Sequence, residues 1–182
     1  MKRYLRLRHP LLVLLGAFVG LVLLHTWATP LYEAPDEVWH DAYVRWLAQG
    51  NGLPSLDDNA SGANQEAAQP PLYYAVAALL RYPFDAGDWH TRLWHNPHFG
   101  YQALDNALDN KNMLIHTDAE RFPWSGSVLA IHVTRLTSLL FGILTVVAAW
   151  GLGYELFQTR KGALLTAALV AFQPQFVFMC GV

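Results

Sequence analysis

The sequence predicts an all-α integral membrane protein, with three transmembrane helices and a large extracytoplasmic loop that carries short interfacial helices. Apolar residues make up 53% of the 182 residues, a share above that of an average soluble domain. They gather in three segments, each of which approaches the length needed to cross a bilayer. Thirteen of the fourteen acidic residues instead lie between Glu33 and Glu120, in the stretch that joins the first two segments.

Residues 11–30 are predicted to form the first transmembrane helix. Four basic residues precede its apolar core, namely Lys2, Arg3, Arg6 and Arg8. By the positive-inside rule, residues 1–10 are then cytoplasmic. A cleaved signal peptide is the alternative, because the strictly apolar core, Leu11 to Leu24, has the length of a signal sequence. The bulky Trp27 near the cleavage position and the two later apolar segments favour the membrane span.

Two further segments are predicted to cross the membrane. Residues 127–157 form the second transmembrane helix, residues 158–161 form a basic cytoplasmic turn, and residues 162–182 form the third helix. The loop of residues 31–126 is then extracytoplasmic. The predicted location is the inner (plasma) membrane, with several passes and a cytoplasmic N-terminus. The third segment is interrupted by Pro174 and ends without a polar tail, so we expect an N-terminal fragment of a larger bundle.

Two helices are predicted within the extracytoplasmic loop. The first covers residues 35–49, because proline suits a first helical turn and the acidic Asp36 and Glu37 suit the positive end of the helix dipole. Its aromatic and apolar face is formed by Trp39, Ala42, Tyr43 and Trp46. The second covers residues 72–82 and is bounded by prolines. It is too short to cross a membrane, so it lies at the surface or packs on the bundle.

The acidic pair Asp36-Glu37 is the first candidate functional site. It lies a few residues beyond the first span, where the chain meets water at the membrane surface. A carboxylate there can act as a general base or bind a divalent cation, and His40 lies one helical turn from Asp36. The alternative is that these acids only stabilise the first turn of a helix. The spacing alone leaves both interpretations open.

Glu66 and Arg135 are two further candidates. Glu66 lies shortly before a Pro-Pro step that fixes the backbone and could hold its carboxylate in a site. The alternative is a solvated loop acid. Arg135 lies just inside the outer end of the second span, where an unpaired cation is costly. It could bind a lipid phosphate through two hydrogen bonds, or form a structural ion pair with a loop acid.

Other polar motifs are interpreted as structural. Three histidines match no standard zinc spacing and are expected in loops or interfaces, namely His90, His95 and His98. His116 and Glu120 could pair one helical turn apart, but Thr117 and Glu120 also form a capping box, which is the favoured interpretation. The single cysteine can form no internal disulfide. No basic tract beyond the first eight residues suggests nucleic acid as a partner.

The order of several motifs resembles the N-terminal part of GT-C-type membrane glycosyltransferases. The most similar branch is the bacterial, family 39-like one, related to protein O-mannosyltransferases and to the aminoarabinose transferase for lipid A. After the first span come EAPDEVWHDAYVRWLAQGNGLP, QEAAQPPLYY, NMLIHTDAERFPWSG and HVTRLTSLLFG. The resemblance extends over essentially the whole chain. Its Pro-Asp-Glu and Pro-Pro-Leu-Tyr-Tyr elements are moderately specific together, and their order strengthens the match.

The resemblance implies an enzyme that transfers a sugar from a polyprenyl-phosphate-linked donor to an acceptor hydroxyl on the extracytoplasmic side, with inversion at the sugar carbon. Asp36 would be the general base, Glu37 its neighbour in the motif, and Glu66 a second acid. Arg135 is expected to bind the donor phosphate, and His40 is a candidate ligand of a divalent metal. The expected partners are the lipid bilayer, the lipid-linked donor, and the remainder of the bundle or partner subunits.

A non-catalytic membrane protein whose outer loop binds a partner or a lipid is the alternative function. It requires only the amphipathic helices and the aromatic residues at the membrane surface. A transporter or channel subunit is disfavoured, because the predicted spans hold few polar groups. Since the resemblance covers only the N-terminal part of such an enzyme, the isolated fragment is expected to be inactive.

Overall fold

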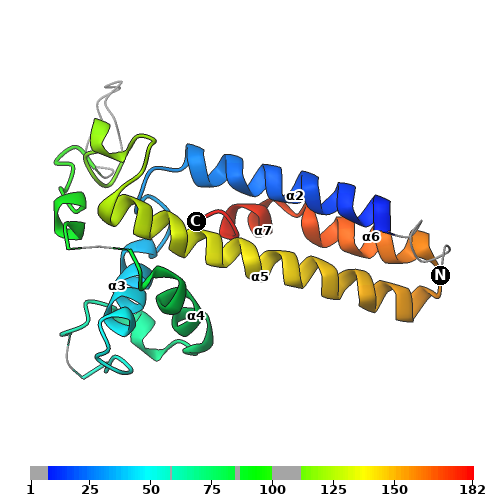
Figure 1. Cartoon of the computed structure of the whole chain (residues 1–182), viewed down its shortest axis with the longest axis horizontal. Coiled ribbons are helices and arrows are strands. Elements are labelled where there is room, and N and C mark those ends of the chain that lie inside the picture. Colours follow the sequence, from blue (N-terminus) through cyan, green and yellow to red (C-terminus); the bar gives the residue numbers. More distant parts are fainter. Residues whose placement is uncertain (1–7, 58, 85–86, 100–111) are drawn as a thin grey trace. The chain divides into compact units, whose positions relative to one another are not determined.

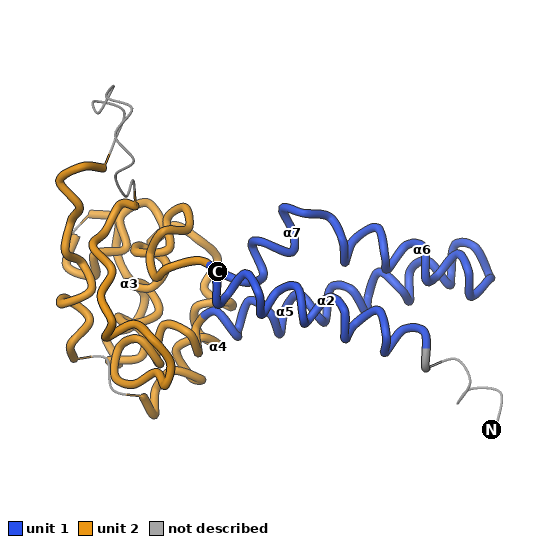
Figure 2. Tube along the Cα trace, turned by 90° about the horizontal axis from the view of Figure 1, so that it is seen from above, with its two compact units in different colours: residues 1–28, 135–182 blue, residues 29–134 orange. Residues whose placement is uncertain are grey.

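A computed structural model describes residues 8–57, 59–84, 87–99 and 112–182. These residues form six α-helices and three short 3-10 helices, and the described ranges contain no β-strand. The all-α prediction is confirmed. The chain divides into two compact units, coloured separately in Figure 2, of which the first comprises residues 1–28 with 135–182 and the second residues 29–134. Most of the predicted cytoplasmic segment, residues 1–10, lies outside the described residues.

The first unit is a group of packed helices (Figure 1). It consists of α2 (Arg8–Ala28), α5 (Gly126–Phe157) from Arg135 onward, α6 (Arg160–Ala171) and α7 (Pro174–Met179). Helix α2 packs against both α6 and α7. The buried core is apolar and contains Phe18, Val22, Leu139, Val146, Ala167, Ala171, Val177 and Cys180. Large aliphatic side chains on the outside remain exposed, as helices facing lipid require, among them Leu24, Leu144, Leu152 and Leu165.

Two helices are long and apolar enough to cross a membrane. They are Pro10–Ala28, with 19 residues, and Gly126–Phe157, with 32 residues. At a rise of 1.5 Å per residue, the part of α5 that belongs to the first unit is about 35 Å long. This length is comparable with the roughly 30 Å of a bilayer's hydrocarbon core. The helices predicted at residues 11–30 and 127–157 are therefore present, with bounds that differ by up to three residues.

The third predicted span differs from the expected single helix. Residues 162–182 are divided between α6 and α7, because the proline at position 174 cannot continue the hydrogen-bonding pattern of α6. Gln173 caps the new helix, and its side-chain oxygen accepts a hydrogen bond from the main-chain nitrogen of Phe176. Neither half has the roughly 20 residues that a helix needs to cross a bilayer alone.

The second unit contains the short helices of the long loop. They are α3 (Glu37–Ala48), η1 (Asn64–Ala68), α4 (Leu72–Arg81), η2 (Trp89–Arg92) and η3 (Asp118–Glu120). Helix α3 packs on α4 and η1 around a core that includes Tyr43, Val44 and Ala77. The rings of Tyr43 and Tyr74 stack with centroids 3.9 Å apart. The two helices predicted in the loop are thus confirmed, the first starting two residues later than expected.

Candidate functional site

Asp36 lies at the N-cap of α3 in a left-handed backbone conformation, with φ at 61°. That conformation costs an L-residue roughly 1–2 kcal/mol. The carbonyl oxygen of Asp36 accepts hydrogen bonds from the nitrogens of Trp39 and His40, 2.9 and 3.0 Å away. Its carboxylate is exposed and forms no capping bond. Within the described ranges this carboxylate has neither a hydrogen bond nor an ion pair.

A cavity of about 470 Å³ lies beside Asp36. We call it the acidic cavity, because its only charged residues among those described are three acids, Glu33, Asp36 and Glu37. The rest of its wall is mostly apolar or aromatic and is formed by Tyr32, Ala34, Pro35, Val38, Trp39, Leu93, His95, Phe99, Met113 and Leu114. A concave, largely apolar surface with a few converging polar groups is the usual form of a small-molecule site.

Glu37, the neighbour of Asp36, is held by the main chain. It is 8% exposed, and its Oε2 accepts a hydrogen bond of 2.8 Å from the nitrogen of Tyr32. Tyr32 itself has a positive φ of 64°. The carboxylate of Glu37 therefore supports the loop that leads into α3, while that of Asp36 remains available. The pair predicted from the sequence consists of two acids with different environments.

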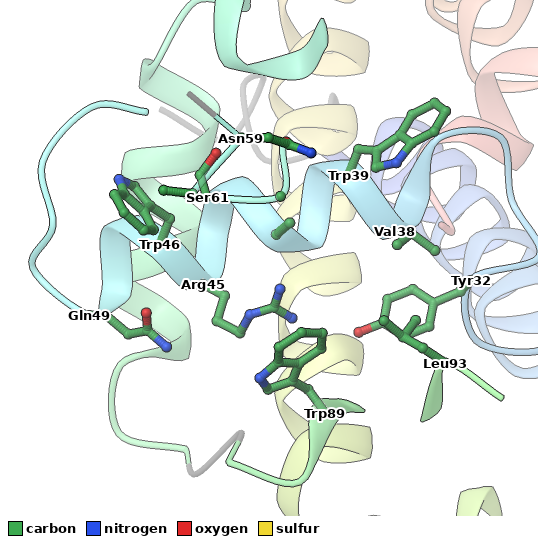
Figure 3. A pocket seen from close by; sticks show the side chains of 13 residues that line it. Tyr32, Val38, Trp39, Arg45, Trp46, Gln49, Asn59, Ser61, Trp89 and Leu93 are labelled. Carbon is green, nitrogen blue, oxygen red and sulfur yellow. The ribbon is translucent and has the colours of Figure 1, made fainter. Parts of the chain in front are cut away.

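Helix α3 also carries a buried charge cluster that the sequence analysis missed. The carboxylate of Asp41 contacts the guanidinium groups of Arg45, at 3.1 Å, and Arg81, and it accepts a hydrogen bond of 2.8 Å from the hydroxyl of Tyr32. Burial and the neighbouring Asp41 raise the pKa of Tyr32 well above its usual value. Figure 3 shows Arg45 and Tyr32 on the side of α3 that faces Trp89.

Glu66 and His40 lie together, apart from the acidic cavity. Nδ1 of His40 is 2.8 Å from the hydroxyl of Tyr74 and 3.4 Å from Oε2 of Glu66. Glu66 is only 4% exposed, so the alternative of a solvated loop acid is wrong. Burial and the adjacent Glu66 raise the pKa of Tyr74. Neither Glu66 nor His40 lines the acidic cavity, so the structure does not bring them together with Asp36 there.

The described residues hold no group of three or more His, Cys, Asp or Glu side chains arranged to hold a metal ion. The role of His40 as a metal ligand therefore stays a prediction without a geometric counterpart. Of the three histidines near residue 95, His95 lines the acidic cavity, where its ring meets the edge of Phe99 at a centroid distance of 6.0 Å.

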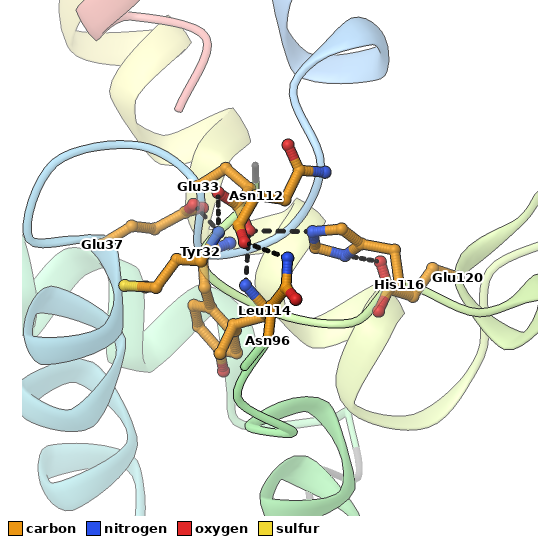
Figure 4. A network of polar contacts seen from close by, with 9 residues as sticks. Tyr32, Glu33, Glu37, Asn96, Asn112, Leu114, His116 and Glu120 are labelled. Carbon is orange, nitrogen blue, oxygen red and sulfur yellow. Dashed lines mark hydrogen bonds and ion pairs between the residues drawn. The ribbon is translucent and has the colours of Figure 1, made fainter. Parts of the chain in front are cut away.

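Hydrogen bonds of Glu33 connect the start of the loop to a later segment of it (Figure 4). Its two carboxylate oxygens accept hydrogen bonds from the nitrogens of Met113, at 2.8 Å, and Leu114, at 2.9 Å. One of them also lies 3.0 Å from Nε2 of His116, whose Nδ1 is 2.8 Å from Glu120. Both ring nitrogens of His116 thus face carboxylates. The sequence analysis missed Glu33, because its partners lie about eighty residues away.

The capping box predicted for Thr117 and Glu120 is wrong. Thr117 does precede η3, but its side chain makes no capping hydrogen bond. The side chain of Glu120 turns to His116 instead, which is the pairing that the sequence analysis held as the alternative. The imidazole of His116 thus takes the place that the main-chain nitrogen of Thr117 has in a capping box.

Arg135 belongs to the first unit and is buried, with 1% of its surface exposed. Its Nη1 donates a hydrogen bond of 3.0 Å to the main-chain oxygen of Thr26, near the end of α2. This contact satisfies a carbonyl group that the helix end leaves without an internal partner. The hydrogen bond is structural. Binding of a donor phosphate by Arg135 stays a prediction and would require this guanidinium to change partners.

Comparisons with protein-family models, curated proteins and solved structures find no match. No family is assigned by similarity to a known protein. The function is therefore inferred from the geometry of the second unit and from the motifs that follow the first span.

Proposed function

We propose that this protein is a membrane glycosyltransferase that transfers a sugar from a polyprenyl-phosphate-linked donor to an acceptor hydroxyl on the extracytoplasmic side. Asp36 is the general base. The motif resemblance motivates the class of reaction, and the environment of Asp36 supports the choice of base. The two candidate spans lie on either side of residues 31–125 in the sequence, and the proposal puts these residues on the extracytoplasmic side of the membrane.

The observation that carries the proposal is the unpaired, exposed carboxylate of Asp36 at the wall of the acidic cavity. A general base must reach the proton that it removes, either directly or through one water molecule. Glu37 and Glu66 do not meet this requirement, since both are buried and engaged by other groups. A cavity of about 470 Å³ also has the size of a site for a sugar-sized ligand.

The chain length between α2 and Asp36 suits a substrate held at the membrane surface. Asp36 follows Ala28, the last residue of α2, by eight positions. Eight residues can extend to at most about 28 Å. The proposal requires Asp36 to lie near the head-group layer, where the phosphate of a lipid-linked donor lies, and the eight-residue connection is short enough to allow it.

The proposed reaction is a direct displacement. The carboxylate of Asp36 takes the proton of the acceptor hydroxyl as the hydroxyl oxygen forms a bond to the anomeric carbon of the donor sugar. The bond between that carbon and the phosphate oxygen breaks, and the polyprenyl phosphate leaves with the electron pair. Attack from the side opposite to the phosphate inverts the configuration of the carbon. Glu37 acts as a positioning residue, because it holds the segment from Tyr32 that carries Asp36.

The test is transfer activity in membranes from cells that carry the gene, with labelled polyprenyl-phosphate sugars as donors. We expect Asp36→Asn to lower the rate by about 100-fold or more, which is the usual contribution of a general base. Asp118→Asn is the matched control, because Asp118 is an exposed acid of the same unit with an 85% exposed side chain. The control should retain full activity.

Three results would oppose the proposal. Full activity of Asp36→Asn would remove Asp36 as the base. A lack of transfer with every donor in membranes from cells that carry the gene would favour the non-catalytic alternative, a loop that binds a partner or a lipid. A product of retained configuration would contradict the direct displacement.

A further inference from the structure

Two further cavities lie beside Trp89, and their character differs from that of the acidic cavity. The first has a volume of about 360 Å³ and the second of about 380 Å³. They share Arg45, Gln49 and Trp89 as walls. We call them the arginine cavities, because Arg45 lines both and Arg81 lines the second. None of the described residues that line either cavity is acidic.

The described side chains beside these cavities carry more positive than negative charge. Of the acids that the structure describes, Asp41 alone contacts Arg45 and Arg81, so two cations share one described anion. Asp41 and Arg81 are 2% and 1% exposed. Bringing a cation out of water is costly unless an anion compensates it. Among the described residues the cluster thus holds one more cation than anion, and a bound anion would balance it.

Arg81 also has an unsatisfied donor. Its Nη1 contacts Asp41, whereas its buried Nη2 has no hydrogen-bond partner among the described residues. A buried donor without a partner costs roughly 1–3 kcal/mol relative to a satisfied one. Guanidinium groups offer paired donors that match the oxygens of phosphate and carboxylate. Arg81 thus combines a place in the wall of the second cavity, beside Arg45, with a buried donor that has no partner among the described residues.

Arg45 is held in a fixed orientation. Its guanidinium lies over the ring of Trp89, 3.6 Å from the centroid (Figure 3). One of its nitrogens contacts Asp41. Stacking on an indole leaves the edge of the guanidinium free to donate hydrogen bonds. Uncharged hydrogen-bonding side chains line the same walls, namely Gln49, Asn59 and Ser61. They could bind hydroxyl groups next to an anion.

We propose that the arginine cavities bind an oxyanion, a phosphate or a carboxylate carried on a sugar, through Arg45 and Arg81. The first arginine cavity shares Tyr32, Val38, Trp39 and Leu93 with the acidic cavity, whereas the second shares no residue with it. The first arginine cavity and the acidic cavity are therefore neighbours. The proposal goes beyond the transfer reaction, since it concerns binding of an anion that need not react.

The test is direct binding to the purified full chain in detergent, measured by calorimetry at constant ionic strength. The probes are inorganic phosphate, glucose 1-phosphate, glucuronate and neutral glucose. We expect saturable binding of at least one of the anions, with a Kd of about 1 mM or lower, and no binding of glucose. Comparison of glucose 1-phosphate with glucuronate separates a phosphate site from a carboxylate site. Absence of saturable binding for all three anions overturns the proposal.

Three variants locate the site. Arg45→Gln should weaken binding of the anion by about tenfold or more. It should still fold, because Asp41 keeps Arg81 and Tyr32 as partners. Arg81→Lys keeps the charge but removes Nη2, and it should weaken binding as well. Arg121→Gln is the matched control, because it removes one charge from an exposed position of the same unit.

The comparison with the control decides between a built site and general attraction. The site is supported if Arg121→Gln binds the anion with an affinity within about twofold of that of the unaltered protein, while Arg45→Gln binds it more weakly. Equal losses in both variants overturn it. Because the measurement is binding of a probe, it can succeed or fail independently of the sugar transfer assay.

Discussion

The main-chain nitrogen of Tyr32 donates a hydrogen bond to the carboxylate of Glu37, 2.8 Å away, and so fixes both ends of the segment that carries Asp36. Tyr32 and Asp36 both adopt positive φ angles within this segment. Backbone in that region persists only where surrounding contacts impose it. The contact between Tyr32 and Glu37 helps to hold Asp36 at the wall of the acidic cavity, together with the hydrogen bonds of Glu33 to Met113 and Leu114.

The structural role of Glu37 can be tested by two substitutions, of which only one keeps a side-chain oxygen that accepts a hydrogen bond. Glu37→Gln keeps an oxygen for the nitrogen of Tyr32 and should cost less than about 1 kcal/mol in the free energy of unfolding. Glu37→Ala removes that oxygen and should cost about 1–3 kcal/mol. Thermal unfolding of the two variants in the same detergent measures the difference. Equal stability of the two would show that the hydrogen bond to Tyr32 is unimportant.

Asp36→Gly should change stability and activity in opposite directions. Glycine adopts a positive φ without steric strain, and no side-chain hydrogen bond is lost. We expect the free energy of unfolding to rise by about 0.5–1 kcal/mol, while sugar transfer is lost with the carboxylate. Thermal unfolding and the transfer assay on the same preparation measure both effects. A less stable Asp36→Gly variant would mean that the aspartate side chain contributes contacts of its own.

Asp88 should make the second unit less stable in acid. Burial acts to raise the pKa of Asp88, but hydrogen bonds from Ser127 and Arg92 outweigh it, and the pKa is lower than the ordinary 3.8. A carboxyl group with a lowered pKa stabilises the folded state above about pH 4. This contribution is lost as the pH falls through the lower pKa of the folded state. Because the side chain is 42% exposed, solvent screening keeps the effect below about 1 kcal/mol.

Asp88→Asn is the variant that isolates this contribution. The asparagine cannot ionise, so the fall in stability between about pH 4 and pH 2 should be smaller than in the unaltered protein. Unfolding by denaturant across this range, followed by tryptophan fluorescence, provides the measurement. An unchanged pH profile would assign the acid sensitivity to other carboxyl groups.

A close approach of helices in the first unit can be tested at Gly142. A Cβ atom at this position would lie 2.6 Å from the sulfur of Cys180 and 3.1 Å from the ring of Phe18. Gly142→Ala should therefore destabilise the unit by about 1–3 kcal/mol. Cys180→Ala in the same chain should recover part of the loss, since it removes the nearest atom. A double-mutant cycle on thermal unfolding measures the coupling, and strict additivity would contradict the contact.

The sequence was sufficient to locate the helices, because their signals are local. Apolar length predicted α2 and α5, and prolines and helical spacing predicted α3 and α4 to within two residues at most ends. The same local rules placed Asp36 at the start of α3. They did not show that its backbone is left-handed, or that Glu37 beside it is engaged by Tyr32.

The contacts that define the cavities depend on residues far apart in the chain. Glu33 and His116 are separated by 83 positions, and Asp41 and Arg81 by 40. No periodicity relates such positions, so a single sequence carries no signal for these pairs. Asp41 and Arg45 are the exception, because a separation of four on a helix could have indicated their pairing.

The hydrogen bonds of Glu33 to Met113 and Leu114 join two points of the chain that are about eighty residues apart. Helices α3 and α4 come from the chain between these two points, as do all the residues that line the arginine cavities except Tyr32. Substitutions in the surface turns of that stretch can therefore alter the walls of the cavities while the two points stay joined.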